Sequence, residues 1–235
     1  MTKNKILLFI VEGPSDEHSL APALEKIINH TARFKVMRSD ITCDYASTVN
    51  NIEKRIKEQG VKKFLKENSQ FTERDICGVV HIVDLDGVFA PDSVVVKRDV
   101  DKAQYYSDKI EIKEDNFNNF LLSRQNKRDI LNHLSTINQI AIPNGIIVPY
   151  SIYYMSCNLD HVLHNKMNST MIEKLNDSIS FGDEYDDPDK FEEFFNCKEI
   201  KIKGTYKETW DYAHKELNSL KKGSNFWLCI DNYKK

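Results

Sequence analysis

Residues 5–27 read KILLFIVEGPSDEHSLAPALEKI, and this stretch predicts the fold of the chain. Ile6–Val11 is a continuous apolar run of the kind found in a strand that is buried on both faces of a sheet. Gly13 and Pro14 end the run, and the polar and acidic residues that follow suit the start of a helix. Over Asp16–His30, apolar residues recur with helical spacing. The stretch is therefore a buried strand followed by an amphipathic helix.

Strands and helices continue to alternate along the rest of the chain. Ile76–Val83 is a second nearly all-apolar run, and it leads directly into Asp84-Leu85-Asp86-Gly87. Further strands are predicted at Phe34–Met37, Ile146–Tyr154 and Phe226–Ile230, and further helices at Asn50–Leu65, Asn116–Ile137, Asn158–Met167 and Tyr206–Leu220. Pro149 lacks an N–H group and predicts an edge strand or a bulge. Alternating strands and helices form a mainly parallel sheet with flanking helices, so we expect an α/β fold.

The composition changes after about Met167, where the chain becomes more acidic and less periodic. A chain of 235 residues is long enough for one sizeable core plus a modest appendage. We therefore expect an α/β domain over residues 1–167 and a C-terminal α-rich appendage of unknown role over residues 168–235. Within the appendage, Asp183–Asp189 is predicted to be a solvated acidic loop.

The overall charge does not by itself indicate a nucleic-acid-binding protein. Thirty-three Lys and Arg residues stand against 36 Asp and Glu, which gives a formal net charge of −3. A polyanion partner would need local positive patches or metal ions held by carboxylates. No apolar run approaches the ~20 residues that a membrane-spanning helix needs. Since the first apolar run ends at Glu12 without a small-residue cleavage site, we expect a strand there and not a signal peptide.

The five cysteines give no sign of a zinc knuckle or of a disulfide framework. Their number is odd, and no two of them stand in a C-x-x-C pair. We expect buried or incidental thiols in a reducing, cytoplasmic protein.

Acidic residues follow the two most apolar strands. Glu12 comes directly after the first strand, with Asp16 one helical turn further on, and Asp84 and Asp86 follow the other. Because ligands of open α/β sheets bind beyond the carboxyl ends of the strands, the four acids converge if the two strands are neighbours. Carboxylates so close together repel one another, and a hard divalent cation such as Mg²⁺ resolves the repulsion. Two such ions ~3.5–4 Å apart would serve a phosphodiester displacement.

The opening stretch, followed about seventy residues later by VVHIVDLDG, resembles a Toprim domain, the catalytic fold of topoisomerases, primases and several nucleases. The family pattern is a strand that ends in Glu-Gly, a helix, and a strand that ends in Asp-x-Asp. By this resemblance Glu12 is the catalytic glutamate, and Asp84 and Asp86 are the metal-binding pair. Asp16 matches the second acid of overcoming-lysogenization-defect (OLD) nucleases. SCNLDHVLHN, residues 156–165, is similar to a later helix of these proteins and adds Asp160 as a further acid.

The resemblance covers Lys5 to Asn165 and implies a Mg²⁺- or Mn²⁺-dependent nuclease that hydrolyses DNA or RNA. It implies Glu12, Asp84 and Asp86 as catalytic residues, with Asp16 and Asp160 as additional metal ligands. It also implies a setting in anti-phage or mobile-element defence. No Walker motif is present, so an ATPase would be a separate partner subunit. The catalytic lysine of the family has no unambiguous counterpart, and the candidates by charge and position are Lys201, Lys203 and Lys207.

Two other interpretations stay open. VDLDGVF, residues 83–89, resembles the first motif of haloacid-dehalogenase phosphatases, with Asp84 as nucleophile and Asp86 as general acid. That motif normally opens its fold, whereas here some eighty residues precede it. The remaining roles in this interpretation fall to Lys166 or Lys174, with Asp183 and Asp187 as Mg²⁺ ligands. The third interpretation is a non-catalytic Toprim module that senses or docks a partner.

Two histidines of the later helix, His161 and His164, have a spacing that can face a site. A packing or surface role is favoured for both, because hydrolytic Mg²⁺ sites prefer oxygen ligands.

Overall fold

The structure is a computed structural model that describes residues 5–37 and 40–234. The strands of its main sheet are β1 (Ile6–Val11), β2 (Thr31–Val36), β3 (Ile76–Asp84), β7 (Gln139–Ala141), β8 (Ile147–Ser156) and β9 (Gly223–Ser224). Within the described residues their order is β2-β1-β3-β8-β7, and β9 pairs with the end of β8. β2, β1, β3 and β8 run parallel, whereas β7 and β9 are antiparallel to β8. The expected mainly parallel α/β sheet is confirmed.

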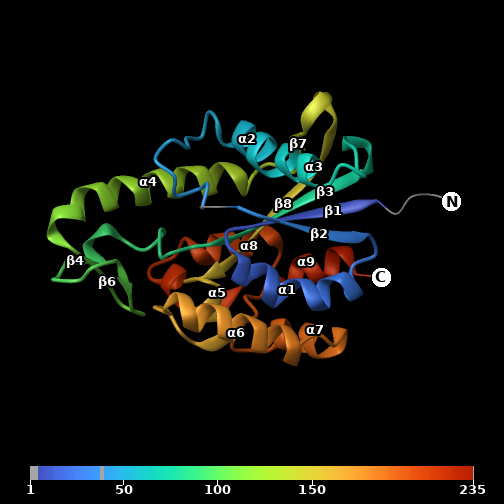
Figure 1. Ribbon diagram of the computed structural model, residues 1–235. Helices are drawn as coiled ribbons and strands as arrows, with labels where there is room; N and C mark the ends of the chain where they lie inside the picture. The colour runs from blue at the N-terminus through green and yellow to red at the C-terminus, as the bar shows by residue number, and fades with distance from the viewer. Residues whose placement is uncertain (1–4, 38–39, 235) are drawn as a thin grey trace.

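Helices cover both faces of this sheet (Figure 1). They are α1 (Pro14–Ile27), α2 (Ile52–Arg55), α3 (Lys62–Glu67), α4 (Phe117–Leu134), α5 (Leu159–His164), α6 (Met171–Glu184), α7 (Pro188–Asn196), α8 (Tyr206–Ala213) and α9 (Trp227–Tyr233). A π-helical turn, Ile56–Val61, joins α2 to α3, so the predicted helix at Asn50–Leu65 forms as one continuous segment. No helix in the described part of the chain combines the length and the apolar character that crossing a membrane requires.

β1 is buried on both faces, as its unbroken apolar sequence predicts. Ile6, Leu8 and Ile10 belong to the core that α2, α3, α4 and α8 cover. Leu7, Phe9 and Val11 belong to the opposite core, beneath α1, α5, α6, α7 and α9. Every side chain of the strand is at most 1% exposed. This complete burial fixes the register of β1 and therefore the position of the acidic residue that follows it.

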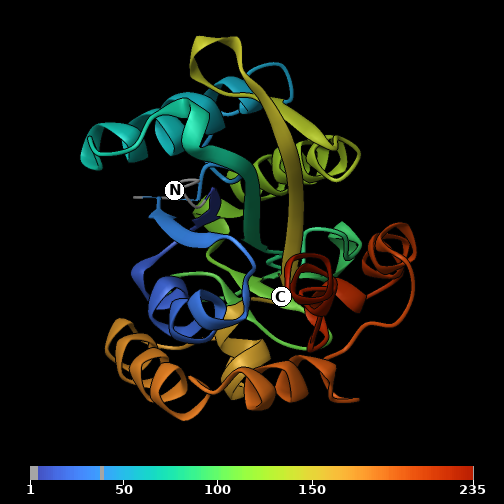
Figure 2. The same cartoon turned by 90° about the vertical axis from the view of Figure 1, so that its right-hand side faces the viewer.

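The segment after Met167 is mainly helical and shares the second core. Phe181 of α6, Phe191 and Phe195 of α7, and Phe226 before α9 pack in the same core as Phe9 of β1. Figure 2 shows α6 and α7 on the outside of α1. α6 approaches α1 closely at Gly182, where an added Cβ would lie 2.4 Å from the carbonyl oxygen of His18. A side chain at this position would force the two helices apart.

A small sheet lies beside the start of α4, at the left of Figure 1. It consists of β4 (Val95–Lys97), β5 (Gln104–Tyr105) and β6 (Ile110–Ile112) in the order β4-β6-β5. Val95, Ile110 and Ile112 pack with Ala90 and Leu220 in a third, smaller core.

Two predicted elements near the C-terminus are wrong. The strand expected at Phe226–Ile230 is the start of helix α9. Phe226 at the N-cap and Cys229 and Ile230 within the helix are buried, and their spacing of three and four is helical. The helix expected over Tyr206–Leu220 ends at Ala213, and only a short 3₁₀ turn follows at Asn218–Leu220.

The acidic loop expected at Asp183–Asp189 is also wrong. Most of these residues belong to the end of α6 and the start of α7. Asp187 caps α7, because its Oδ1 accepts the N–H of Lys190 at 3.1 Å, and Pro188 occupies the first helical position. Pro149 does not lie on an outer strand: it pairs with β7 one residue before β8 starts to pair with β3.

Candidate functional site

Two acids meet where β1 and β3 end. The strands are adjacent and parallel, with Ile10 opposite His81, so their carboxyl ends lie at the same edge of the sheet. Glu12 directly follows β1, and Asp84 is the last residue of β3. Oε1 of Glu12 accepts the backbone N–H of Asp84 at 3.1 Å. The sheet therefore brings together two of the predicted acids that are 72 residues apart in the sequence.

Asp16 turns back onto the end of β1. Its Oδ2 accepts the backbone N–H groups of Glu12 and Gly13, each at 3.0 Å. The four-residue spacing between the two acids thus fixes the turn that presents Glu12. Burial raises the pKa of Asp16 to about 6, although these two N–H groups and the ammonium of Lys174 act in the opposite direction.

The Asp84–Gly87 turn follows β3 and is hydrogen-bonded to the start of α5 and to the residues just before it. Oδ1 of Asp84 accepts the N–H of Leu159 at 2.8 Å, and the N–H of Asp86 donates to the carbonyl of Cys157 at 2.7 Å. Asp86 has φ 48° and Gly87 has φ 63°, so the chain reverses through the left-handed region. At Gly87 an added Cβ would lie 2.3 Å from Leu220 Cδ2, so glycine is required for space as well as conformation.

We name four acids at this edge of the sheet the acid cluster: Glu12, Asp16, Asp84 and Asp86. Their surroundings disfavour negative charge. Burial raises the pKa of Glu12 well above its usual range, and nearby Asp40 raises it further. Burial likewise raises the pKa of Asp84, and neighbouring Asp86 and Asp16 add to the shift. Negative charge is therefore unfavourable here unless a proton or a cation offsets it.

Lys127 of α4 supplies part of the missing positive charge. Its side chain is fully buried, and its Nζ lies 2.7 Å from Oδ2 of Asp86 and 2.7 Å from Oδ2 of Asp40. Burial alone would lower the pKa of this ammonium, but the two carboxylates outweigh burial and raise it. Burial raises the pKa of Asp40, yet Lys127 and hydrogen bonds with Cys43 and Thr42 hold it below its usual range.

The sequence interpretation missed Lys127, although a signal for it exists. Ile130, Leu131 and Leu134 are the apolar stripe of the helix, and Lys127 stands in line with them, three, four and seven residues earlier. A lysine on the buried face of a helix needs a buried anionic partner. Asp40 lies in an irregular segment and has no comparable signal.

Asp160 reaches the same edge of the sheet from α5. It is 5% exposed, and Nζ of Lys174, on α6, lies 2.9 Å from its Oδ2. Although burial lowers the pKa of Lys174, the ion pair with Asp160 and the nearby Asp84 and Asp16 raise it. The further acid predicted at Asp160 is thus next to the acid cluster and already has a cationic partner.

Three potential ligands lie close enough together to hold a metal ion. In the described residues this group consists of Asp40, Cys43 and Asp86, whose donor atoms lie within 4.8 Å of one another. Among residues 5–37 and 40–234, neither Glu12 nor Asp84 belongs to such a group of three. Lys127 already pairs with both aspartates, and burial raises the pKa of the Cys43 thiol. A thiol is a soft ligand, whereas Mg²⁺ and Mn²⁺ prefer oxygen.

No protein-family model, curated protein or solved structure matches this chain. The function must therefore be argued from the geometry of the acid cluster and from the motifs in the sequence.

The lysines expected by charge and position make their contacts elsewhere. Nζ of Lys201 lies 3.8 Å from the centre of the Trp227 ring, Lys207 pairs with Asp211, and Lys203 is exposed. The lysines beside the acids are instead Lys127 and Lys174.

The two histidines of α5 have structural contacts. Nδ1 of His161 accepts the N–H of Cys157 at 3.1 Å, and burial lowers the pKa of His161 to about 4. The ring of His164 packs edge-on against Phe181. Neither contact involves the acid cluster, which agrees with the packing role favoured for both.

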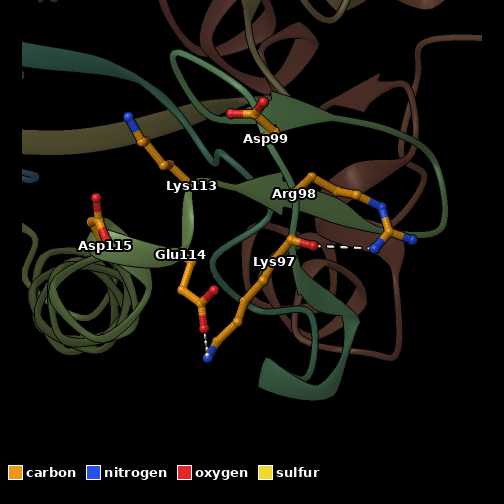
Figure 3. Close-up of a pocket in the computed structure, with 6 residues that line it drawn as sticks. All are labelled: Lys97, Arg98, Asp99, Lys113, Glu114 and Asp115. Carbon is orange, nitrogen blue, oxygen red and sulfur yellow. Dashed lines mark hydrogen bonds and ion pairs between the residues drawn. The ribbon is translucent and has the colours of Figure 1, made fainter.

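A surface hollow near the small sheet carries no net charge. Figure 3 shows it between β4 and the start of α4, lined by Lys97, Arg98, Asp99, Lys113, Glu114 and Asp115. Lys97 pairs with Glu114 at 2.9 Å. Three cations and three acids cancel, so nothing in this hollow favours a phosphate or a metal ion.

Proposed function

We propose that this protein is a divalent-metal-dependent nuclease of Toprim type that hydrolyses phosphodiester bonds of DNA or RNA. The observation that supports this most strongly is the contact between Glu12 and the backbone of Asp84, with Asp86 two residues further on. These are the three residues that the Toprim resemblance marks as catalytic. The proposal includes a role in anti-phage or mobile-element defence and a separate ATPase subunit as a partner.

The donor set of the acid cluster fits Mg²⁺ or Mn²⁺. In the described residues, Glu12, Asp84 and Asp86 each accept hydrogen bonds through one oxygen, which leaves the other oxygen for a metal ion. Mg²⁺ keeps several waters and commonly needs only one or two protein carboxylates, so a three-ligand cage is not required. Burial, and then the neighbouring acids, raise the pKa values of Glu12 and Asp84, so a cation beside them would stabilise their ionised forms.

Lys127, Asp16 and Glu12 have separate roles around the bound ion. A bound divalent ion supplies Lewis-acid charge that offsets the negative charge developing on the phosphate. Lys127 holds Asp86 in place through a buried ion pair, and Asp16 fixes the turn that presents Glu12. Glu12 lies against the backbone of Asp84, so its carboxylate is placed either to hold the ion or to accept a proton from the attacking water.

The phosphatase interpretation fits these residues less well. Lys174 does lie near Asp84, as that interpretation requires. Asp187, however, caps α7, and Asp183 lines a hollow between α1 and α6. Glu12 and Asp16 would also have no role.

A cleavage assay tests the proposal. The wild-type protein is incubated with single- and double-stranded DNA and RNA, with Mg²⁺, Mn²⁺ or EDTA, and in parallel with a generic phosphomonoester. We expect cleavage of one nucleic acid that EDTA and Glu12→Gln abolish. Asp183→Asn is the matched control and should cleave like the wild type.

Other outcomes reject the proposal in distinct ways. Phosphomonoester turnover that survives Glu12→Gln but not Asp183→Asn would establish the phosphatase. Inactivity on every substrate, together with no binding of Mg²⁺ or Mn²⁺ by calorimetry, would leave the non-catalytic module.

A further inference from the structure

The outer side of α6 exposes a row of large apolar side chains. Met171 is 87% exposed and Ile172 is 74% exposed, while Leu175 and Ile179 are each 46% exposed. Their positions recur with helical spacing over more than two turns, so they share one side of the helix. Soluble proteins rarely leave a contiguous apolar patch of this kind uncovered, and such patches mark interaction sites.

The row continues into a hollow between α6 and α1. The two helices lie side by side in both ribbon views (Figures 1 and 2). The hollow has a volume of about 470 Å³, and Ala21 and Pro22 of α1 line it together with Ile179 and Gly182 of α6. We name this hollow and the exposed row together the α6 groove.

Acidic side chains edge the α6 groove. Glu17, Glu25 and Asp183 line the hollow. Glu25 lies 3.6 Å from Arg33, whereas Glu17 and Asp183 have no ion pair within the described residues. The groove therefore combines an apolar floor with two carboxylates, those of Glu17 and Asp183, that have no ion-pair partner among the described residues.

We propose that the α6 groove binds an amphipathic helix of a partner protein, with its apolar face on the groove and with lysine or arginine beside that face. A helix laid into a groove between two helices presents apolar anchors at spacings of three, four and seven residues, which matches the row on α6. The carboxylates select a basic flank. They repel a nucleic acid, and a symmetric contact with a second copy of this chain would set this patch against itself, which supplies apolar residues and acids but no basic flank.

Peptide selection tests this proposal on the full-length protein. A phage-displayed library of random peptides is selected against the wild type, and binding of the recovered peptides is measured by fluorescence anisotropy. We expect peptides with apolar residues at helical spacing and flanking Lys or Arg. Ile172→Asp/Ile179→Asp should weaken their binding by about tenfold or more. Asp183→Lys should weaken binding at low salt more than at high salt.

Leu122→Asp is the matched control. Leu122 is a 69% exposed apolar residue on α4, so the same change there should leave peptide binding unchanged. Selected peptides without basic residues, or peptides whose binding survives the double variant, would overturn the proposal. So would sedimentation that shows a wild-type dimer which Ile172→Asp/Ile179→Asp converts to monomer, since the occupant would then be a second copy.

Discussion

Asp84→Asn is expected to reduce metal-dependent cleavage by about three orders of magnitude and, without metal, to stabilise the fold. Loss of a metal-binding carboxylate removes several kcal/mol of transition-state stabilisation, and each 1.36 kcal/mol is about tenfold in rate. Asparagine keeps the oxygen that accepts the N–H of Leu159 but removes a charge that burial, Asp86 and Asp16 disfavour. We expect a gain of about 0.5–2 kcal/mol in the free energy of unfolding, the usual size of a stabilising substitution, in exchange for lost activity.

Urea unfolding with EDTA and with Mg²⁺ measures the second effect. Mg²⁺ should stabilise the wild type, because an ion that binds only the folded state adds to its stability, and it should stabilise Asp84→Asn much less. Asp101→Asn, at an exposed position outside the helices and strands, is the control and should change neither stability nor cleavage. A variant that keeps cleavage, or that is less stable than the wild type in EDTA, would contradict the proposed role of Asp84.

Lys127→Met is expected to destabilise the fold by about 3–5 kcal/mol, the usual effect of breaking a buried ion pair from one side. Methionine fills a similar space but leaves Asp40 and Asp86 without their common cation. Lys127→Met/Asp40→Asn should recover part of the loss, because one of the two uncompensated charges is then removed as well.

Chemical unfolding followed by circular dichroism compares these variants with Lys113→Met, the same change at an exposed position. We expect the control to stay within about 0.5 kcal/mol of the wild type. If Lys127→Met were equally mild, the lysine would not be the counter-charge of the two aspartates. The same conclusion would be drawn if the double variant were less stable than Lys127→Met alone.

The fold was predictable where local patterns agree with burial. Ile6–Val11 is apolar throughout, the run at Ile76–Val83 is apolar apart from His81, and both form buried parallel strands. The strand prediction at Phe226–Ile230 was wrong because a run of five apolar residues fits a short buried strand as well as a buried helix. Its helical form depends on packing against α7 and β8, which no local pattern records.

The acids of the candidate site were predictable for the same reason. Glu12, Asp84 and Asp86 come directly after buried strands, so the sheet alone determines their positions. Their counter-charges were not predictable in the same way. Lys174 lies on a helix that the weak periodicity after Met167 concealed, and Lys127 reaches Asp86 only through the packing of α4.

The order of synthesis has a consequence for the candidate site, in which Glu12 contacts Asp84 and Lys174 pairs with Asp160. A ribosome that adds ~5–20 residues per second needs on the order of ten seconds between Glu12 and Lys174. During that interval the nascent chain carries the acids that follow β1 and β3 without the phenylalanines of α6 and α7 that complete the second core. The site is therefore completed only after Lys174 and the phenylalanines of α6 and α7 have left the ribosome.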